Sequence, residues 1–233
     1  MKIIKWEELP QNMQTPEVLE YYNILKKKKF SLFFKRLFDF TVSLIMLIIL
    51  SPVFLVLAVA IKLDSPGPVF YRQVRVTQYG KKFRIFKFRS MVSNADKIGT
   101  QVTVCNDRRI TKVGKLIRKC RLDEICQLID ILRGTMTFVG TRPEVPKYVE
   151  SYTPEMMATL LLPAGVTSLA SIMYKDEDEL LSGAEDTDKT YIEDVLPGKM
   201  KYNLQAISNY SFFDDIKIMF MTIFTVLGKE YKD

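Results

Sequence analysis

The sequence predicts a mainly helical chain with a small β-hairpin, attached to a membrane by one bent helix. Three observations predict this architecture. A 22-residue apolar run extends from Phe40 to Ile61 and is interrupted by Ser51-Pro52. Two short strand-like stretches come after it, with a glycine-containing turn between them. Apolar residues then recur at helical spacing from Thr111 to Leu132.

The apolar run is long enough to cross a bilayer, since about 20 apolar residues span the hydrocarbon core. A proline removes a backbone donor and clashes with the preceding turn, so the helix is expected to bend at Ser51-Pro52. Lysine and arginine are abundant on both flanks, at residues 26–36 and 62–89, and such an excess is typical of cytoplasmic flanks. We therefore expect a re-entrant helix over 35–63 that returns to the face it entered. A kinked transmembrane anchor is the alternative.

Composition limits the partners and the chemistry. The chain has 34 Lys and Arg against 27 Asp and Glu, a net charge of +7, which favours anionic lipid headgroups and phosphorylated substrates. No zinc-finger, homeodomain or RNP-type signature is present, so nucleic acid is not an expected partner. The absence of histidine excludes a Ser-His-Asp triad and a His-ligated metal. The three cysteines form no C-x-x-C pair. Carboxylates, Lys, Arg, Tyr and hydroxyl groups must then carry the chemistry.

Turn residues and periodicity place the next elements of the chain. Asp64-Ser65-Pro66-Gly67-Pro68 ends the membrane segment. Strands are expected over Val69–Val76 and Lys82–Phe88, joined through Gln78-Tyr79-Gly80, as a hairpin with a basic face.

Two helices are expected between Thr111 and Leu132, because the apolar register slips near Arg121-Leu122-Asp123. Gly134 ends the second helix. Residues 174–190 are acidic and read as a surface loop or mobile helix. Phe212–Leu227 is too short to span a bilayer and is expected to be a core or interfacial helix.

The helix junction carries the strongest candidate chemistry. A carboxylate at Asp123 would lie among unpaired backbone N–H groups, which favour anions, and Arg118 and Arg121 add donors suited to phosphate. Of two adjacent carboxylates, Asp123 and Glu124, one can attack phosphorus while the other holds a divalent ion such as Mg²⁺. The alternative is that both only cap the first turn.

Two further patterns are candidate sites. The glycine-flanked stretch 134–140 leads to Arg142 before Pro143, a turn where a guanidinium could meet a diphosphate or remain solvated. Asp186 and Asp188 form a D-x-D sequence of the kind that nucleotide-sugar glycosyltransferases use for a metal.

Several short motifs occur in a fixed order along the chain. They are Lys35-Arg36, Ser51-Pro52, Asp64-Ser65-Pro66-Gly67-Pro68-Val69-Phe70-Tyr71-Arg72-Gln73, Phe86-Lys87-Phe88-Arg89-Ser90-Met91, Asn106-Asp107-Arg108-Arg109-Ile110-Thr111, Leu122-Asp123-Glu124 with Gln127, and Gly140-Thr141-Arg142-Pro143-Glu144. In this order they resemble the bacterial sugar transferase family, the monotopic polyprenyl-phosphate phosphoglycosyl transferases. The resemblance covers about Lys35 to Leu227 and leaves residues 1–34 uncovered.

The resemblance implies an α/β membrane-associated fold with a re-entrant helix and interfacial helices. Family members move a phosphosugar from a UDP-sugar to undecaprenyl phosphate and release UMP, as the first membrane step of capsule, exopolysaccharide or other lipid-linked glycan synthesis. By resemblance, Asp123 attacks the β-phosphate and Glu124 holds Mg²⁺. The residues expected to bind substrate phosphates are Arg118, Arg142, Lys87 and Arg89.

The expected organisation is an N-terminal appendage over 1–34, the re-entrant helix over 35–63 and a catalytic domain over 64–233. This domain would face the cytoplasm from the inner membrane. Two alternatives stay open: a membrane glycosyltransferase that uses Asp186 and Asp188 with a metal and releases UDP, and a non-enzymatic basic membrane adaptor. A homo-oligomer is compatible with the sequence, which names neither the sugar nor the glycan.

Overall fold

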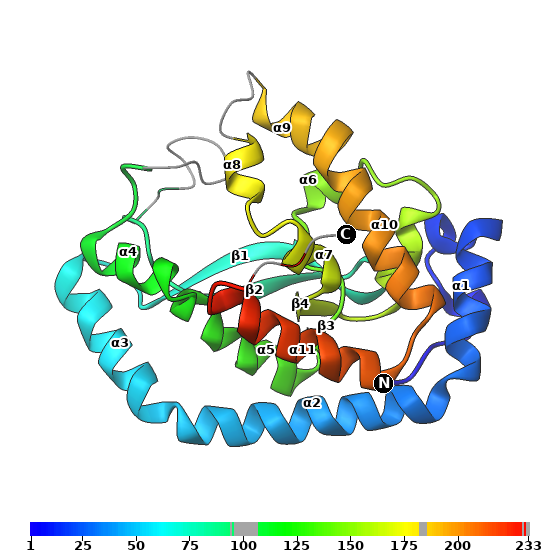
Figure 1. Ribbon diagram of the computed structural model, residues 1–233, viewed down its shortest axis with the longest axis horizontal. Coiled ribbons are helices and arrows are strands. Elements are labelled where there is room, and N and C mark those ends of the chain that lie inside the picture. Colours follow the sequence, from blue (N-terminus) through cyan, green and yellow to red (C-terminus); the bar gives the residue numbers. More distant parts are fainter. Residues whose placement is uncertain (94, 96–106, 182–185, 230, 232–233) are drawn as a thin grey trace.

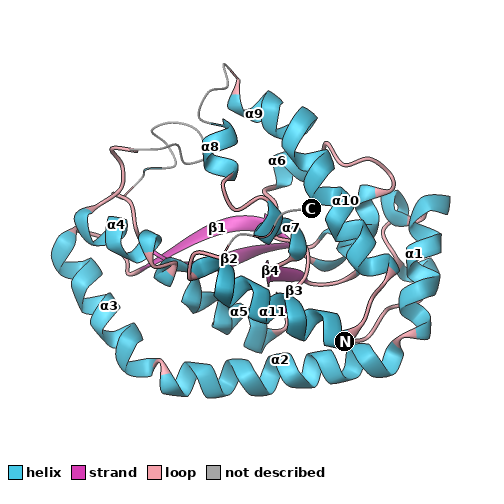
Figure 2. Cartoon of the chain, in the orientation of Figure 1, coloured by secondary structure: helices cyan, strands magenta, loops and turns pink. Residues whose placement is uncertain are grey.

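The computed structural model describes residues 1–93, 95, 107–181, 186–229 and 231. Cys105 and Asn106 of the sequence patterns lie outside the described residues. The chain is a mixed α/β structure in which many helices enclose two small sheets (Figure 2). Figure 1 shows a long bent helix pair running along one side of this unit.

The helix pair consists of α2 (Lys29–Ile49) and α3 (Ser51–Asp64), which meet at an angle of 61°. Pro52 lies in the first turn of α3, where its missing N–H leaves no helical bond unmade. Within the described ranges, no single helix has the length and hydropathy of a membrane span, whereas the bent pair meets both conditions together. The predicted position of the bend is confirmed.

One face of α2 carries buried charges that join it to the rest of the molecule. The Lys35 ammonium donates to the backbone carbonyl of Val139 (2.8 Å) and to the Asp215 carboxylate (2.7 Å). Asp39 is 1% exposed. Its carboxylate accepts hydrogen bonds from the Thr137 hydroxyl (2.7 Å) and from the backbone N–H of Phe138 (3.3 Å). Since a buried charge is costly without a partner, these contacts fix the register of α2 against β3.

Arg36 extends this polar stripe to a second element. Its guanidinium donates to the carbonyls of Ile131 (2.7 Å) and Leu132 (2.9 Å) at the end of α5 (Leu128–Arg133). Gly134, at φ 82°, then ends this helix as predicted. The sequence places Lys35 and Arg36 among the flanking charges that favour lipid headgroups, but both turn inward instead.

The predicted hairpin is confirmed almost to the residue. Strand β1 (Phe70–Val76) pairs antiparallel with β2 (Lys82–Phe88) through the short turn η3 (Gln78–Gly80). The alternation of bulky and basic residues suits a half-buried ribbon, since successive side chains point to opposite faces.

A second sheet pairs two strands that are distant in the sequence. Strand β3 (Met136–Val139) lies parallel to β4 (Ala164–Thr167). A Cβ on Gly165 would lie 2.2 Å from the backbone nitrogen of Gly140, so only glycine allows this close approach.

The structure contains further elements outside these sheets. They are η1 (Trp6–Glu8), η2 (Gln11–Met13), α1 (Pro16–Lys27), α4 (Lys112–Lys119), η5 (Leu122–Gln127), α6 (Pro146–Val149), η6 (Met156–Leu161), α7 (Leu169–Met173), α8 (Glu177–Leu181), α9 (Thr187–Thr190), η7 (Tyr191–Val195), α10 (Leu196–Ser208) and α11 (Phe212–Val226). The acidic region 174–190 thus contains short helices, α8 and α9.

Residues 1–34 pack onto the rest of the chain. Met13, Val18 and Leu25 are fully buried in one cluster with residues of η6 and α10. The predicted division of the chain at residues 34 and 63 stays a prediction, but the N-terminal segment shares a core with η6 and α10.

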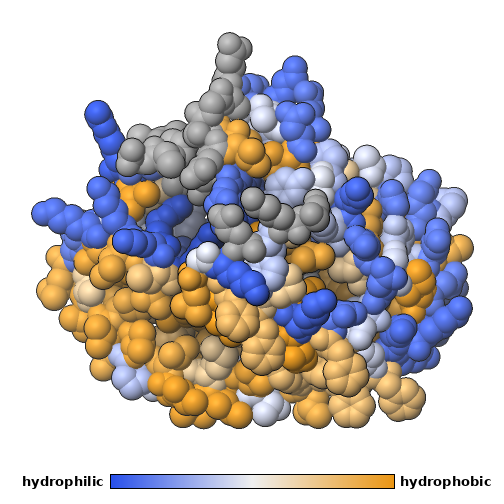
Figure 3. All heavy atoms as spheres, viewed as in Figure 1, coloured by the Kyte–Doolittle hydropathy of each residue, from blue (hydrophilic) through white to orange (hydrophobic). Residues whose placement is uncertain are grey.

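An apolar belt covers the side of the molecule formed by α2, α3 and α11 (Figure 3). On α11, Ile218 is buried, whereas Phe213 and Phe220 are 82% and 59% exposed. This helix therefore packs on the core by one face and adds the other to the belt. The exposed apolar residues of α2 and α3 include Phe30, Phe33, Ile48, Ile49, Leu55, Val56 and Leu63.

The buried ion pair between α2 and α11 gives a stability prediction. Lys35→Met leaves the Asp215 carboxylate without its cation, which costs about 3–5 kcal/mol for a buried pair. Lys29→Met, at an exposed lysine of the same helix, is the control and changes stability by about 0.5 kcal/mol or less. Thermal unfolding of the detergent-purified variants measures both, and equal melting temperatures would contradict the assigned role of Lys35.

Candidate active site

A cavity of about 1330 Å³ lies beside the hairpin, the junction of α4 and η5, and the loop after β3. Two acidic side chains, Asp123 and Glu124, line it among ten basic ones. A concave surface with this charge balance concentrates anions. The basic residues of its wall are Arg72, Arg75, Arg84, Lys87, Arg89, Arg109, Arg118, Lys119, Arg121 and Arg142.

The predicted break between two helices places the acidic pair. Helix α4 ends at Lys119, and Arg121 adopts a left-handed conformation at φ 55° before η5 begins. A residue in the left-handed conformation interrupts a right-handed helix, which explains the slip in apolar register. Asp123 and Glu124 thus lie in the first turn of η5, beside strand β2.

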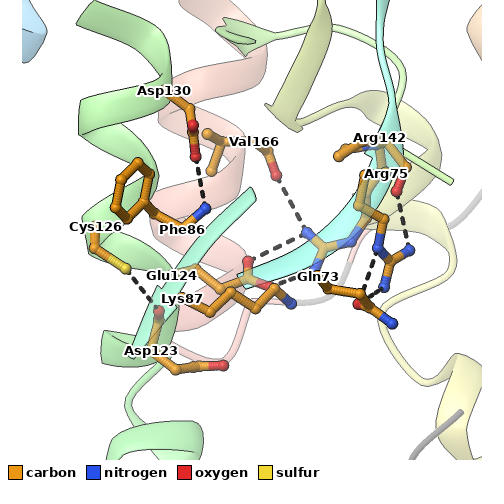
Figure 4. Close-up of polar contacts among 11 residues, drawn as sticks. Gln73, Arg75, Phe86, Lys87, Asp123, Glu124, Cys126, Asp130, Arg142 and Val166 are labelled. Carbon is orange, nitrogen blue, oxygen red and sulfur yellow. Dashed lines mark hydrogen bonds and ion pairs between the residues drawn. The ribbon is translucent and has the colours of Figure 1, made fainter. Parts of the chain in front are cut away.

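Glu124 is the centre of a charged cluster (Figure 4). Its carboxylate accepts a hydrogen bond from Lys87 Nζ (2.9 Å) and a two-pronged ion pair from the Arg142 guanidinium. Burial disfavours its charged form, but the charges of Arg142 and Lys87 outweigh burial and hold the pKa of Glu124 well below its usual value. The Glu124 carboxylate therefore holds two cations in the cavity wall.

Asp123 differs from Glu124 in its ion pairing and in the direction of its net pKa shift. Asp123 is 9% exposed, and its carboxylate points away from that of Glu124 (Figure 4). It makes no ion pair with any described residue. Burial and then the charge of Glu124 raise its pKa, against opposing effects of Lys87 and Arg118. A carboxylate with a raised pKa and no bound cation is a stronger base and nucleophile than its neighbour.

The four residues predicted to bind phosphate lie in different surroundings. Lys87 and Arg142 hold Glu124, and Arg118 lines the cavity from the last turn of α4. Arg89 also reaches the cavity wall, but its guanidinium donates to the carbonyls of Ser65 (2.6 Å) and Ile61 (3.2 Å). The contacts therefore assign Arg89 to holding the end of α3, and its role toward phosphate stays a prediction.

Arg75 is a site residue that sequence reasoning missed. Its guanidinium bonds the side-chain oxygen of Gln73 and the backbone carbonyl of Pro143 (3.0 Å), beside Arg142. In the hairpin register Tyr71 faces Lys87, and positions 71, 73 and 75 share one face. That period of two could have placed Arg75 on the side of Lys87.

Residues 30–229 match the family described as bacterial sugar transferase. The chain belongs to this family. A relative from Aeromonas hydrophila, named UDP-N-acetylgalactosamine-undecaprenyl-phosphate N-acetylgalactosaminephosphotransferase, is 37% identical over 198 residues. One from Klebsiella pneumoniae, named UDP-glucose:undecaprenyl-phosphate glucose-1-phosphate transferase, is 39% identical over 197 residues. The Bacillus subtilis sugar transferase EpsL is 32% identical over 198 residues.

These similarities cover unequal shares of the relatives. They include 84%, 82% and 84% of this chain, but 44%, 39% and 88% of the three relatives in the same order. The chain thus spans less than half the length of the first two sugar transferases and most of the third.

The two aspartates of the D-x-D sequence have local structural contacts of their own. Asp186 caps α9 by accepting from the Lys189 N–H (3.0 Å), and Asp188 pairs with Lys147 and accepts from the Tyr148 hydroxyl (2.6 Å). No group of three acidic or cysteine side chains gathers as a metal site in the part of the chain that the structure describes.

Glu124 has room for Mg²⁺ only if a substrate supplies further ligands. A carboxylate can accept about four hydrogen bonds. Glu124 Oε1 accepts two, from Lys87 and Arg142, and Oε2 accepts one, from Arg142. One position on Oε2 is left, and Mg²⁺ commonly binds one or two carboxylates plus substrate phosphates. The donor set is compatible with an ion shared between Glu124 and a diphosphate.

The ion pair of Glu124 can be tested without any substrate. Arg142→Met leaves a buried carboxylate with one cation fewer, which costs about 1–3 kcal/mol. Glu124→Gln removes the same contact from the other side, so the double variant Arg142→Met/Glu124→Gln is expected to lose less stability than the sum of the two single variants. Thermal unfolding compares the three variants with Arg84→Met, at an exposed arginine. Strictly additive losses would contradict the pairing.

Proposed function

We propose that this chain is a phosphoglycosyl transferase that moves a sugar phosphate from a UDP-sugar to undecaprenyl phosphate. One observation carries the proposal: in a strongly basic cavity, Glu124 is ion-paired with Lys87 and Arg142, whereas the Asp123 carboxylate has no ion pair to a described residue. The basic wall suits a diphosphate donor and a lipid phosphate in turn. The names of the relatives, which are undecaprenyl-phosphate sugar phosphotransferases, support the same reaction class.

In the first step a carboxylate oxygen of Asp123 attacks the β-phosphorus of the UDP-sugar. The new bond joins this oxygen to phosphorus, and the bond from the β-phosphorus to the bridging oxygen of UMP breaks. UMP leaves with that electron pair, and the sugar phosphate stays on Asp123 as an acyl phosphate. Arg118 and Arg142 stabilise the charge that develops on the phosphoryl oxygens.

In the second step an oxygen of undecaprenyl phosphate attacks the same phosphorus. The bond to Asp123 breaks, the free carboxylate is regenerated, and a lipid diphosphate sugar forms. Two displacements at one carboxylate let a single cavity serve a soluble donor and then a lipid acceptor. The ion pair between Lys87 and Glu124 does not involve Asp123, so neither displacement needs to break it.

The proposed reaction uses Mg²⁺. Glu124, through Oε2, would hold the ion together with the diphosphate oxygens of the donor. Bound there, Mg²⁺ would neutralise charge on the phosphates and act as a Lewis acid.

The membrane arrangement is inferred from the apolar belt. We place α2 and α3 in one leaflet as a re-entrant pair, with α11 at the interface and the cavity facing the cytoplasm. The exposed apolar side chains of these helices and their 61° bend support this arrangement. The lipid phosphate then meets Asp123 at headgroup depth.

Replacing Asp123 tests the proposed function. Asp123→Asn removes the nucleophile and is expected to lower turnover at least about 1000-fold, as loss of a covalent catalyst commonly does. Membrane association persists, because the substitution lies outside the apolar belt. The assay measures nucleotide release by detergent-purified protein given Mg²⁺, undecaprenyl phosphate and a panel of UDP-sugars.

Asp186→Asn is the control in that assay. It retains full activity with UMP as the released nucleotide, because Asp186 only caps α9. Release of UDP, lost in the Asp186→Asn variant, would support the glycosyltransferase alternative instead. Full activity of Asp123→Asn would overturn the proposal, and a wild type inactive with every UDP-sugar would favour the adaptor alternative.

Straightening the helix pair tests the membrane arrangement. Replacing Ser51-Pro52 with two leucines removes the break, so the N-terminal segment is expected to leave its core with η6 and α10 and to cross the membrane while the C-terminus stays in the cytoplasm. Reporter tags at both ends measure this. If both ends of the variant still report the cytoplasm, flanking charge and not the bend sets the topology.

A further inference from the structure

A second buried charged cluster lies behind Arg142 and takes no part in the two displacement steps. The Glu144 carboxylate accepts a hydrogen bond from the Tyr191 hydroxyl (2.5 Å) and lies 3.6 Å from Lys199 Nζ. Lys199 donates to the Tyr191 hydroxyl (3.0 Å) and pairs with Glu177 of α8 (2.8 Å). The side chains of Lys199 and Glu144 are each 7% exposed.

The shape of the α9–α10 helix explains how Tyr191 and Lys199 meet. They are eight residues apart, with a wide π-helical turn, η7, between them. Pro197 lies in the first turn of α10 and cannot donate to a carbonyl one turn earlier, which favours such a turn. Helical π-turns re-aim side chains and occur often at functional sites. Here the turn directs both residues toward Glu144.

The cluster connects directly to the segment that carries Arg142. Glu144 lies two residues after Arg142, and its backbone carbonyl accepts from the Val76 N–H at the end of β1 (2.9 Å). Arg75 holds the intervening Pro143 carbonyl. The segment is thus held by the hairpin on one side and by Tyr191 and Lys199 on the other.

Charge also links the cluster to Arg142. The charge of Glu124 and then those of Glu144 and Glu177 raise the pKa of the Arg142 guanidinium. Burial and then Glu144 and Glu177 raise the pKa of Tyr191, so its hydroxyl stays protonated and donates. Acidic and basic groups alternate from Glu177 through Lys199 and Glu144 to Arg142.

We infer that Tyr191 and Lys199 are positioning residues that set the place of Arg142 for phosphoryl transfer, acting through Glu144. This inference rests on the proposed function and extends it to residues of α10 and η7 that contact no reacting atom. Apolar side chains in place of this charged cluster would be at least as stabilising, because buried ion pairs rarely add stability. We therefore assign the cluster the function of fixing the loop that carries Arg142.

The test uses two tyrosines whose rings pack together, 4.5 Å apart. Tyr191→Phe removes the hydroxyl between Glu144 and Lys199 and keeps the ring. Tyr148→Phe removes a similar hydroxyl, bonded to Asp188, and is the matched control. Lys199→Met would leave the buried Glu144 and the partly exposed Glu177 without this cation and is unsuitable because it risks unfolding.

The measured quantity is kcat/KM for UMP release, determined for full-length protein in detergent with the UDP-sugar it uses. Tyr191→Phe is expected to lower kcat/KM about tenfold, the effect of one lost hydrogen bond. Tyr148→Phe changes it by less than about twofold, since its hydroxyl is not linked to Arg142. Both variants keep melting temperatures similar to each other.

A double-mutant cycle separates positioning from a general structural role. In an Arg142→Lys background, which already lacks the two-pronged guanidinium, Tyr191→Phe is expected to cost less than about twofold. A tenfold loss in both backgrounds, or equal values for the two tyrosine variants, would overturn the inference alone. A wild type that releases no UMP from any UDP-sugar would overturn the proposed function and the inference with it.

Discussion

The buried charged side chains of α2 determine how this helix packs against the sheet of β3 and β4 and against α5 and α11. Lys35 and Asp39 bind β3 and α11, and Arg36 binds the last carbonyls of α5. Charges on an otherwise apolar helix are tolerated only when they are paired. The helix pair that carries the apolar belt therefore has one allowed register against the sheet of β3 and β4.

That register determines where the acidic pair lies. Helix α5 continues from η5 without a gap, so the element that Arg36 binds is joined directly to the one that carries Asp123 and Glu124. Arg89 adds a second tether, from the end of β2 to the last turn of α3. The cavity is thereby held at a fixed depth relative to the apolar belt, which the proposed reaction between a soluble donor and a lipid phosphate requires.

Local patterns in the sequence predicted the local structure. The bend at Ser51-Pro52, the hairpin and the break before Asp123 each depend on proline chemistry, alternation or a register slip within about ten residues. The inward turn of Lys35 and Arg36 could not be predicted in the same way, because their partners lie about 100 or more residues away. The pairing of β3 with β4 and the packing of residues 1–34 are long-range in the same sense.

The candidate site was predictable to a similar extent. Asp123, Glu124 and Arg142 stand out in the sequence by motif, and the structure brings them together with Lys87. The motif could not assign different states to the two carboxylates, since that difference comes from Lys87 and Arg142 binding only Glu124. Nor could it indicate Tyr191 and Lys199, whose link to Arg142 exists only in the folded chain.

An assay without the lipid acceptor tests whether Asp123 carries the sugar phosphate between two substrates. Detergent-purified protein freed of lipid phosphate is mixed with Mg²⁺ and its UDP-sugar, and the moles of released nucleotide are compared with the moles of protein. If Asp123 forms the covalent intermediate, a rapid burst of up to one UMP per protein chain is expected, which then stops until undecaprenyl phosphate is added. No UMP before the lipid is added would contradict it, because the phosphosugar would then pass directly from donor to acceptor.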